Sequence, residues 1–305
     1  MLRLDSFARN YAMFKDFKQL NYDPEKVCKL FRDWINLDIE KSKTQLNTIS
    51  EISQLIDNIN FAKDLGMPSA ILATKILQYR IDDELDCCMA YLFGSNLDWL
   101  RSQMVMDETT KDLMKEIKES DTPSIFMIAH HGPFRAFPAF LQLFEKKFTF
   151  THTENDYLEP FFKHGVIKDP ILGIQFGENF IPKIAKAYQE GSNILLVGDY
   201  SLSPRKSDRQ TTMYGRDIHA PSGPARFAHK MNASLYSVRL IRTGDCKFEF
   251  NVSKIADKAN WNTLGDEKQI GAVVESCFDW VRETVKLKPE AWQTWYRFKQ
   301  MCLHE

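Results

Sequence analysis

The pattern of apolar and polar residues changes near residue 120. Before that point, apolar residues recur every three or four positions, as over 7–20, which is the spacing of one face of an amphipathic helix. Similar stripes run over 49–59 and 68–77, and Asp23 with Pro24 forms a typical helix start. We therefore expect residues 1–119 to form an N-terminal helical layer.

Beyond residue 120, short apolar runs alternate with helical patterns. Strands are predicted over 124–129, 148–152, 172–176, 193–199, 234–242 and 247–252, and helices over 136–144, 181–189, 225–231 and 269–285. This alternation is typical of α/β proteins, in which a mostly parallel sheet is covered by helices on both faces. We expect residues 120–305 to form such a core and to pack with the helical layer into one compact unit.

The first of these strands ends in His130 and His131, followed by Gly132 and a proline. A strand, a sharp turn with ionisable side chains and an apolar helix present catalytic groups at the carboxyl edge of a sheet. The strand over 193–199 ends in Asp199, so the same edge should bring Asp199 close to the histidines. A histidine acts as a general base when a partner fixes its tautomer. The alternatives are an aspartate that only caps the next turn and loop histidines without a chemical role.

Arginines are concentrated in the polar segment between 200 and 219, which we expect to be a long loop. Arg205, Arg209 and Arg216 lie in it. Guanidinium groups suit phosphates such as those of coenzyme A or a carrier phosphopantetheine. Solvent-exposed loop charges are the alternative for each of them.

The charges nearly cancel, with 40 Lys+Arg against 41 Asp+Glu and a formal net charge of −1. This balance argues against nucleic-acid binding, which needs a basic excess. No stretch approaches the roughly 20 apolar residues of a membrane span, and the N-terminus has no signal-peptide pattern. We expect a cytoplasmic protein without a transmembrane segment. The basic and aromatic helix over 7–20 leaves peripheral contact with a membrane or a carrier protein open.

Six cysteines are scattered along the chain, and no pair has metal-ligand spacing. We expect them to be reduced thiols of a cytosolic protein, with no metal site and no bound cofactor.

Four blocks resemble the lysophospholipid acyltransferase superfamily, specifically the bacterial lipid A biosynthesis (Kdo-dependent) acyltransferases. They are 128–135 (IAHHGPFR), 191–199 (GSNILLVGD), 220–228 (APSGPARFA, followed by SLYSV at 234–238) and 289–299 (PEAWQTWYRFK). The third block is the most specific, and together the blocks cover roughly residues 122–299.

The resemblance implies acyl transfer from a coenzyme A or acyl-carrier thioester to a hydroxyl or amine. In the family motif a catalytic histidine is followed, after four residues, by an acid that orients it. Aligning Gly132 with the motif places His130 at the catalytic position and Arg135 at the acid position, and shifting to His131 places Ala136 there. Because a guanidinium cannot accept the imidazole N–H, either Asp199 or the turn at 154–156 supplies the carboxylate, or the usual reaction is lost. We also expect this protein to lack the family's N-terminal membrane anchor, since no such segment is recognised in the sequence.

We therefore expect a soluble, divergent acyltransferase, for example in natural-product biosynthesis. It would move an acyl or aminoacyl group from an acyl or peptidyl carrier protein, or from acyl-CoA, to an amine or hydroxyl of a small molecule or lipid. His130 or His131 would be the base and backbone N–H groups near Gly132 would hold the oxyanion. The expected substrate-binding residues are Gly132, Arg135, Arg205, Arg209, Arg216 and Arg226.

Three alternatives remain open. The first is a conventional O-acyltransferase that acts on a lipid or glycolipid from the membrane surface. The second is a non-catalytic homologue that binds a carrier protein. The third is a thioester hydrolase.

Overall fold

The computed structural model describes residues 23–41, 45–59, 61–152, 171–175, 177, 179–200, 209–261 and 266–303. Three expectations concern residues outside this part of the chain: the apolar stripe over 7–20, the turn at 154–156 and Arg205.

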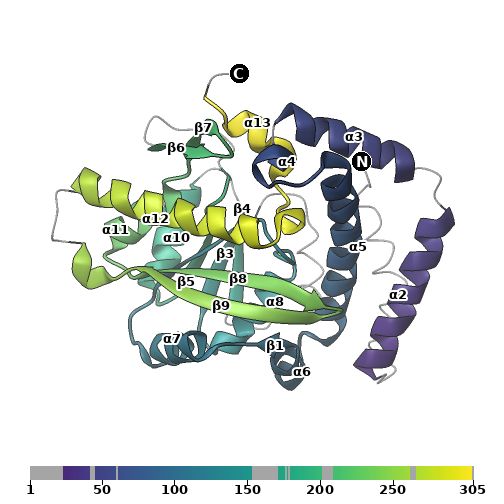
Figure 1. Cartoon of the computed structure of the whole chain (residues 1–305). Coiled ribbons are helices and arrows are strands. Elements are labelled where there is room, and N and C mark those ends of the chain that lie inside the picture. Colours follow the sequence, from purple (N-terminus) through teal and green to yellow (C-terminus); the bar gives the residue numbers. More distant parts are fainter. Residues whose placement is uncertain are drawn as a thin grey trace.

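A seven-stranded sheet organises the molecule (Figure 1), with the strand order β1-β9-β8-β2-β5-β3-β4. All neighbouring strands are parallel except β8 and β9, which form an antiparallel hairpin. The strands are β1 (Met104–Val105), β2 (Ile125–Ile128), β3 (Phe148–His152), β4 (Ile171–Gln175), β5 (Asn193–Val197), β8 (Leu235–Gly244) and β9 (Lys247–Ala256). The prediction of an α/β fold with a mostly parallel sheet is confirmed.

Helices cover both faces of the sheet (Figure 1). Successive side chains of β2 alternate between two apolar cores, with Phe126 and Ile128 in one and Ile125 and Met127 in the other. The first core is closed by α6 (Leu97–Ser102), α7 (Glu108–Glu119), α8 (Phe137–Phe140) and the 3-10 helix η2 (Leu141–Phe144). The second is closed by α10 (Phe180–Gln189), α11 (Gly223–Met231) and α12 (Asp266–Leu287).

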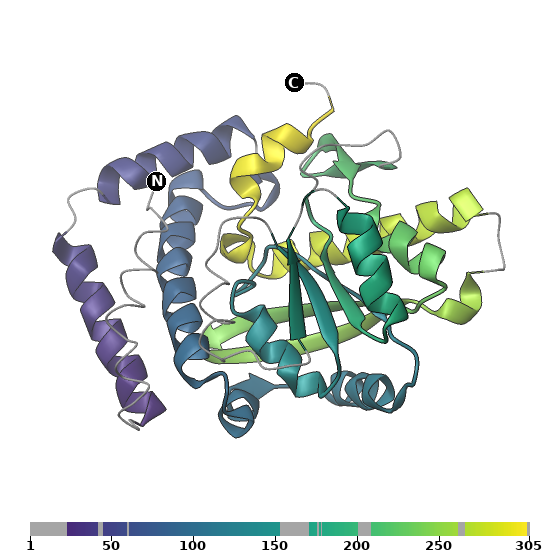
Figure 2. The same cartoon turned by 180° about the vertical axis from the view of Figure 1, so that it is seen from behind.

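The helix α5 (Ser69–Phe93) packs into both cores: Leu72 and Ile76 belong to the second, whereas Leu85 and Met89 belong to the first. The helices α2 (Pro24–Lys41) and α3 (Gln45–Asn58) lie on the outer side of α5 (Figures 1 and 2), and the short α4 (Phe61–Asp64) precedes it. The first 119 residues are not purely helical, because β1 pairs with β9 in the main sheet. Along the described residues, no helix is both long and apolar enough to cross a membrane.

The segment expected to be a polar loop contains a separate hairpin, formed by β6 (Arg209–Met213) and β7 (Arg216–Ala220). Its turn uses Tyr214 and Gly215, both with positive φ, the geometry that closes a two-residue hairpin. A short 3-10 turn, η3 (Lys258–Asn260), follows β9. After α12 the described chain continues through two 3-10 turns and a short α-helix: η4 (Pro289–Ala291), η5 (Trp295–Arg297) and α13 (Phe298–Met301).

Candidate functional site

The strands β2 and β5 are parallel neighbours, with Ile128 paired to Val197, so the turns that follow them leave the sheet side by side. The structure brings their first ionisable side chains together: Nδ1 of His130 lies 2.8 Å from Oδ1 of Asp199. A carboxylate only accepts hydrogen bonds, so Nδ1 carries the proton and donates it. In the neutral form of the imidazole, the lone pair is therefore on Nε2. The expected juxtaposition of these two residues at the sheet edge is observed.

Asp199 is completely buried, and its second oxygen is also engaged. Oδ2 accepts hydrogen bonds from Nε1 of Trp292, at 2.8 Å, and from the hydroxyl of Thr294, at 3.0 Å. Burial by itself raises the pKa of this carboxyl, but the charge of His130 and the hydrogen bonds from His130 and Trp292 outweigh it and hold the pKa below its usual value. Asp199 is thus a fixed, ionised partner for the imidazole.

His130 combines this anchor with access to solvent. Its side chain is 26% exposed, and its ring packs edge-on against Phe134 with the centroids 4.9 Å apart. Among the described residues, no hydrogen-bond partner occupies Nε2. An imidazole held through Nδ1 with Nε2 available has the geometry of a general base.

His131 lies in the opposite environment. Its side chain is buried, and Nε2 donates a hydrogen bond of 2.9 Å to the backbone carbonyl of Lys288. Burial disfavours the imidazolium and lowers the pKa of His131 to about 4, against the weaker opposing effect of that hydrogen bond. His131 is therefore neutral near pH 7 and fastens the turn to the C-terminal segment. Of the two candidate bases, the geometry favours His130.

We predict that His131 makes stability depend on acidity. Because its pKa is lower in the folded chain than in the unfolded chain, the unfolded chain binds the proton first as the pH falls. The contribution of His131 to the free energy of unfolding is complete above about pH 6.5. It is lost as the pH falls towards 4, which lowers the free energy of unfolding by about 3 kcal/mol in total. Urea unfolding at several pH values measures it. Between about pH 7.5 and 4, the free energy of unfolding of the wild type should fall by about 3 kcal/mol more than that of His131→Gln. The glutamine amide does not titrate but can still donate to the carbonyl of Lys288. Parallel curves for the two proteins would contradict the assignment.

The turn after the histidines is fixed by the C-terminal segment 288–294. The N–H of Gly132 donates to the carbonyl of Ala291, at 3.1 Å, and the N–H of Gln293 donates to the carbonyl of His130, at 2.7 Å. We expected backbone N–H groups near Gly132 to hold the oxyanion. The N–H of Gly132 itself is already used within the fold, so this role stays a prediction for its neighbours alone. Gly132 has a structural role instead.

A side chain at Gly132 should destabilise the protein. The residue has φ +70°, and a Cβ there would lie 2.2 Å from the carbonyl oxygen of Leu240. For Gly132→Ala we expect a loss of at least about 2 kcal/mol in the free energy of unfolding, since the left-handed conformation alone costs 1–2 kcal/mol for an L-residue. Denaturant titration measures the loss. Gly223→Ala is the control, because its Cβ would meet nothing within 4 Å. Equal stability of the two variants would refute the prediction.

Arg135, expected to bind substrate, is instead part of a buried ion-pair cluster. Its Nε donates to Oδ2 of Asp83 at 3.0 Å, its Nη2 contacts the same carboxylate, and its Nη1 donates to Glu84 at 3.1 Å. Only 10% of the side chain is exposed. Oδ2 of Asp83 also accepts a hydrogen bond from Nε2 of Gln293, at 3.2 Å. Arg135 therefore fastens the histidine turn to α5, and its side chain is committed to this cluster rather than placed to bind a substrate.

The remaining arginines pair elsewhere. Arg209 lies 3.4 Å from a carboxylate oxygen of Glu275, and Arg226 makes two 3.0 Å hydrogen bonds to Glu267, both partners being on α12. Arg216 begins β7, in which Ile218 forms a β-bridge with Cys302. These contacts link Arg209 and Arg226 to α12, and the substrate-binding roles of all three arginines stay predictions.

Sequence reasoning missed the residues that hold the site together. Trp292, Thr294 and Gln293 lie in the block 289–299, which was recognised as a motif without any role assigned to its side chains. The sequence does contain a feature that marks Asp83: it belongs to the acidic run 82–86, which lies in the middle of the largely buried helix α5. Acidic residues are rarely buried without a cationic partner, so this run pointed to buried arginines. In the described part of the chain, no group of histidine, cysteine and acidic side chains is arranged to hold a metal ion.

Comparisons with known proteins do not add a family to this description. No protein-family model matches the chain, and no curated protein gives a significant match. The case for a function rests on the contacts of His130 and Asp199 and on the residues that hold them.

Proposed function

We propose that this protein is an acyltransferase that moves an acyl or aminoacyl group from a thioester to an amine or hydroxyl acceptor. The donor would be acyl-CoA or an acyl or peptidyl carrier protein, and the acceptor a small molecule, a carrier-bound intermediate or a lipid. The observation that carries the proposal is the 2.8 Å contact between Nδ1 of His130 and the buried Asp199, which leaves Nε2 as a base. The resemblance of four sequence blocks to lipid A acyltransferases supports the reaction class.

In this reaction Nε2 of His130 takes the proton of the acceptor O–H or N–H as the acceptor attacks the thioester carbonyl carbon. Asp199 stabilises the imidazolium that forms, because its negative charge is fixed against Nδ1. The tetrahedral intermediate then collapses and the C–S bond breaks. The departing thiolate takes the proton back from Nε2, which regenerates the neutral histidine.

The replacement of the family's acid by Arg135 fits this scheme. Asp199 meets the need for a carboxylate on Nδ1, so position 135, which four residues separate from His130, is free for another use. The positive charge of Arg135 is matched by Asp83 and Glu84, which limits its effect on the imidazolium.

We also propose that the protein works in the cytoplasm. All six cysteines are free thiols, which supports a reducing compartment. Coenzyme A and carrier thioesters would be the donors there.

The test is donor turnover by the full chain. Short, medium and long acyl-CoA and acyl-carrier thioesters are each incubated with a panel of amines and alcohols, and with phospholipid vesicles. Released thiol is measured with a thiol-reactive dye and products by mass spectrometry. Thiol release that depends on a soluble acceptor supports the proposal, and acylated lipid would assign the membrane-surface alternative. Release without any acceptor would indicate a hydrolase, and no release from any donor would contradict the enzyme assignment.

A further inference from the structure

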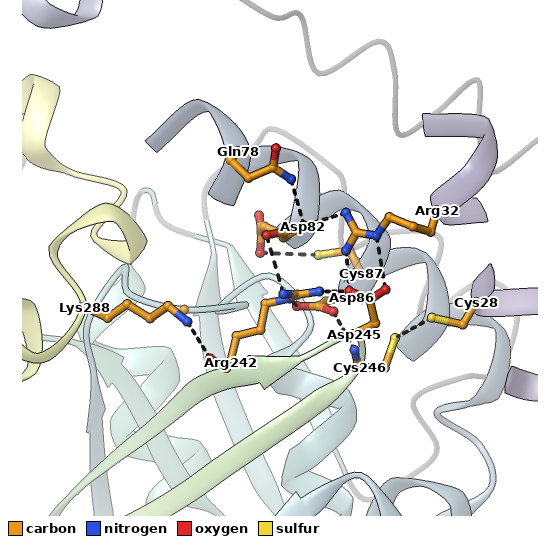
Figure 3. Close-up of polar contacts among 12 residues, drawn as sticks. Cys28, Arg32, Gln78, Asp82, Asp86, Cys87, Arg242, Asp245, Cys246 and Lys288 are labelled. Atoms are coloured by element: carbon orange, nitrogen blue, oxygen red, sulfur yellow. Dashed lines mark hydrogen bonds and ion pairs between the residues drawn. The ribbon is translucent and has the colours of Figure 1, made fainter. Parts of the chain in front are cut away.

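Two cysteines that are far apart in the sequence meet on the side of the molecule formed by α2 and α5. Cys28 lies in the N-terminal part of α2, Cys246 lies at the turn between β8 and β9, and their sulfur atoms are 3.8 Å apart (Figure 3). Both residues line a cavity of about 630 Å³, together with Trp99, Met89 and Lys247 among others. A small molecule can therefore reach the neighbourhood of the pair.

Cys246 is held rigidly. Its N–H donates to Oδ1 of Asp86, at 3.1 Å, and Oδ2 of Asp86 accepts a 2.8 Å hydrogen bond from Nε of Arg242. Asp86 is completely shielded by α5 and the hairpin, and the backbone of Cys246 adopts a positive φ of 55°. These contacts fix the backbone of Cys246, and with it the position from which its side chain extends.

The facing end of α2 is held to the same turn. Arg32, one helical turn after Cys28, donates to both carboxylate oxygens of Asp245, at 2.5 and 3.1 Å, and to Asp82 of α5, at 2.6 Å (Figure 3). Asp245 immediately precedes Cys246. The ion pairs therefore keep Cys28 opposite Cys246, which lowers the entropic cost of joining them.

The two thiols differ in reactivity. Cys28 is partly exposed, and the hydrogen bond with Cys246 lowers the pKa of its thiol, more than burial and the neighbouring carboxylates raise it. The same hydrogen bond, together with burial, raises the pKa of Cys246. A lower pKa and access to solvent make Cys28 the nucleophile of the pair.

We propose that Cys28 and Cys246 form an oxidisable dithiol, which a small-molecule disulfide such as glutathione disulfide converts into a disulfide between α2 and the β8–β9 turn. The thiolate of Cys28 attacks the external disulfide, forms a mixed disulfide and releases one thiolate. The thiol of Cys246, on losing its proton, then attacks Sγ of Cys28, forms the protein disulfide and releases the second thiolate. The protein pair is oxidised by two electrons and the external disulfide is reduced to two thiols.

The geometry limits how far the two sulfur atoms have to move and which other cysteines can react with the external disulfide. A disulfide has an S–S length of about 2.05 Å, so the sulfur atoms have to approach by about 2 Å. This movement draws the first turns of α2 towards the hairpin turn and narrows the cavity between them. Of the other cysteines, Cys87, Cys88 and Cys277 are buried, and burial raises the pKa of their thiols. Cys302, directly after α13, is the remaining partly exposed thiol and serves as the control.

The test is equilibration of the native full chain in glutathione buffers from fully reduced to fully oxidised. After denaturation, the thiols that remain are alkylated and counted by intact mass, and peptide mapping locates the disulfide. We expect six reactive thiols in the reduced protein and four in the oxidised one, with Cys28 and Cys246 joined. Reduction with a dithiol should restore all six.

Variants separate the two steps. Cys246→Ser should stop at a glutathione adduct on Cys28, and Cys28→Ser should form neither this adduct nor the disulfide with Cys246. Cys302→Ser should form the same disulfide as the wild type, with its thiol count falling from five to three. An oxidised sample that keeps six thiols, or a disulfide that does not include Cys28, would overturn the proposal. The readout is thiol chemistry alone, so it does not depend on the proposed acyl transfer.

Discussion

Replacing His130 with alanine is expected to lower the rate of acyl transfer by about 10²- to 10⁴-fold, the range associated with a general base. The loss should fall on kcat, because in the proposed reaction Nε2 of His130 takes the proton that moves in the transition state. The side chain is partly exposed, so the fold should tolerate the change. Donor-thiol release with the best acceptor of the panel measures the loss, and thermal unfolding verifies the fold.

His229→Ala is the matched control for that experiment. His229 is also a partly buried histidine, but it lies near the end of α11 that leads into β8, at the opposite edge of the sheet from His130. Its removal should leave the rate of transfer within a few-fold of the wild type. Similar losses in His130→Ala and His229→Ala would show that the histidine mechanism is wrong.

Replacing Arg135 with alanine is expected to lower the free energy of unfolding by about 3–5 kcal/mol, the usual cost of removing one partner of a buried ion pair. Asp83 is only 1% exposed, and Arg135 is its partner for two hydrogen bonds. Without the guanidinium, the buried carboxylate keeps only neutral donors, Nε2 of Gln293 and the thiol of Cys87, among the described residues. Denaturant unfolding near pH 7 measures the change.

Two further variants make this prediction specific. Arg101→Ala removes an arginine whose ion pair with Glu145 is about half exposed, and it should cost much less. Combining Arg135→Met with Asp83→Leu removes both partners of the buried pair, and the double variant should be more stable than Arg135→Ala. If Arg135→Ala were as mild as Arg101→Ala, the buried cluster would not be what holds the turn to α5.

The sequence predicts the sheet core well, because its strands are buried on both faces. The run 148–152 is observed as β3, and the strands expected at 124–129 and 193–199 are observed as β2 and β5. The hairpin of β6 and β7 was missed since only Met213, Ile218 and Ala220 of its residues are buried. Its turn also lacks the Asn-Gly or Asp-Gly pair that normally indicates a hairpin. The two-residue β1 is too short to produce a pattern.

The site was predictable to the extent that it follows from sheet topology. Parallel strands end at one edge, which suffices to place Asp199 near the histidine turn. Which histidine meets Asp199 depends on the local backbone, since neighbours in a tight turn point in different directions, and Gly132 there has positive φ. The roles of Trp292 and Arg135 depend on partners 93 and 52 residues away along the chain, and no local pattern identifies which residues pair.

The most direct test of the central claim is a double-mutant comparison of His130→Ala, Asp199→Asn and the double variant under single-turnover conditions. The asparagine keeps the size of Asp199 but can stabilise neither the imidazolium nor the required tautomer, so about 10²- to 10⁴-fold should be lost in that variant too. Because the two residues act as one unit, the double variant should be no slower than His130→Ala alone. Losses that multiply in the double variant, or a wild-type rate in Asp199→Asn, would contradict the account.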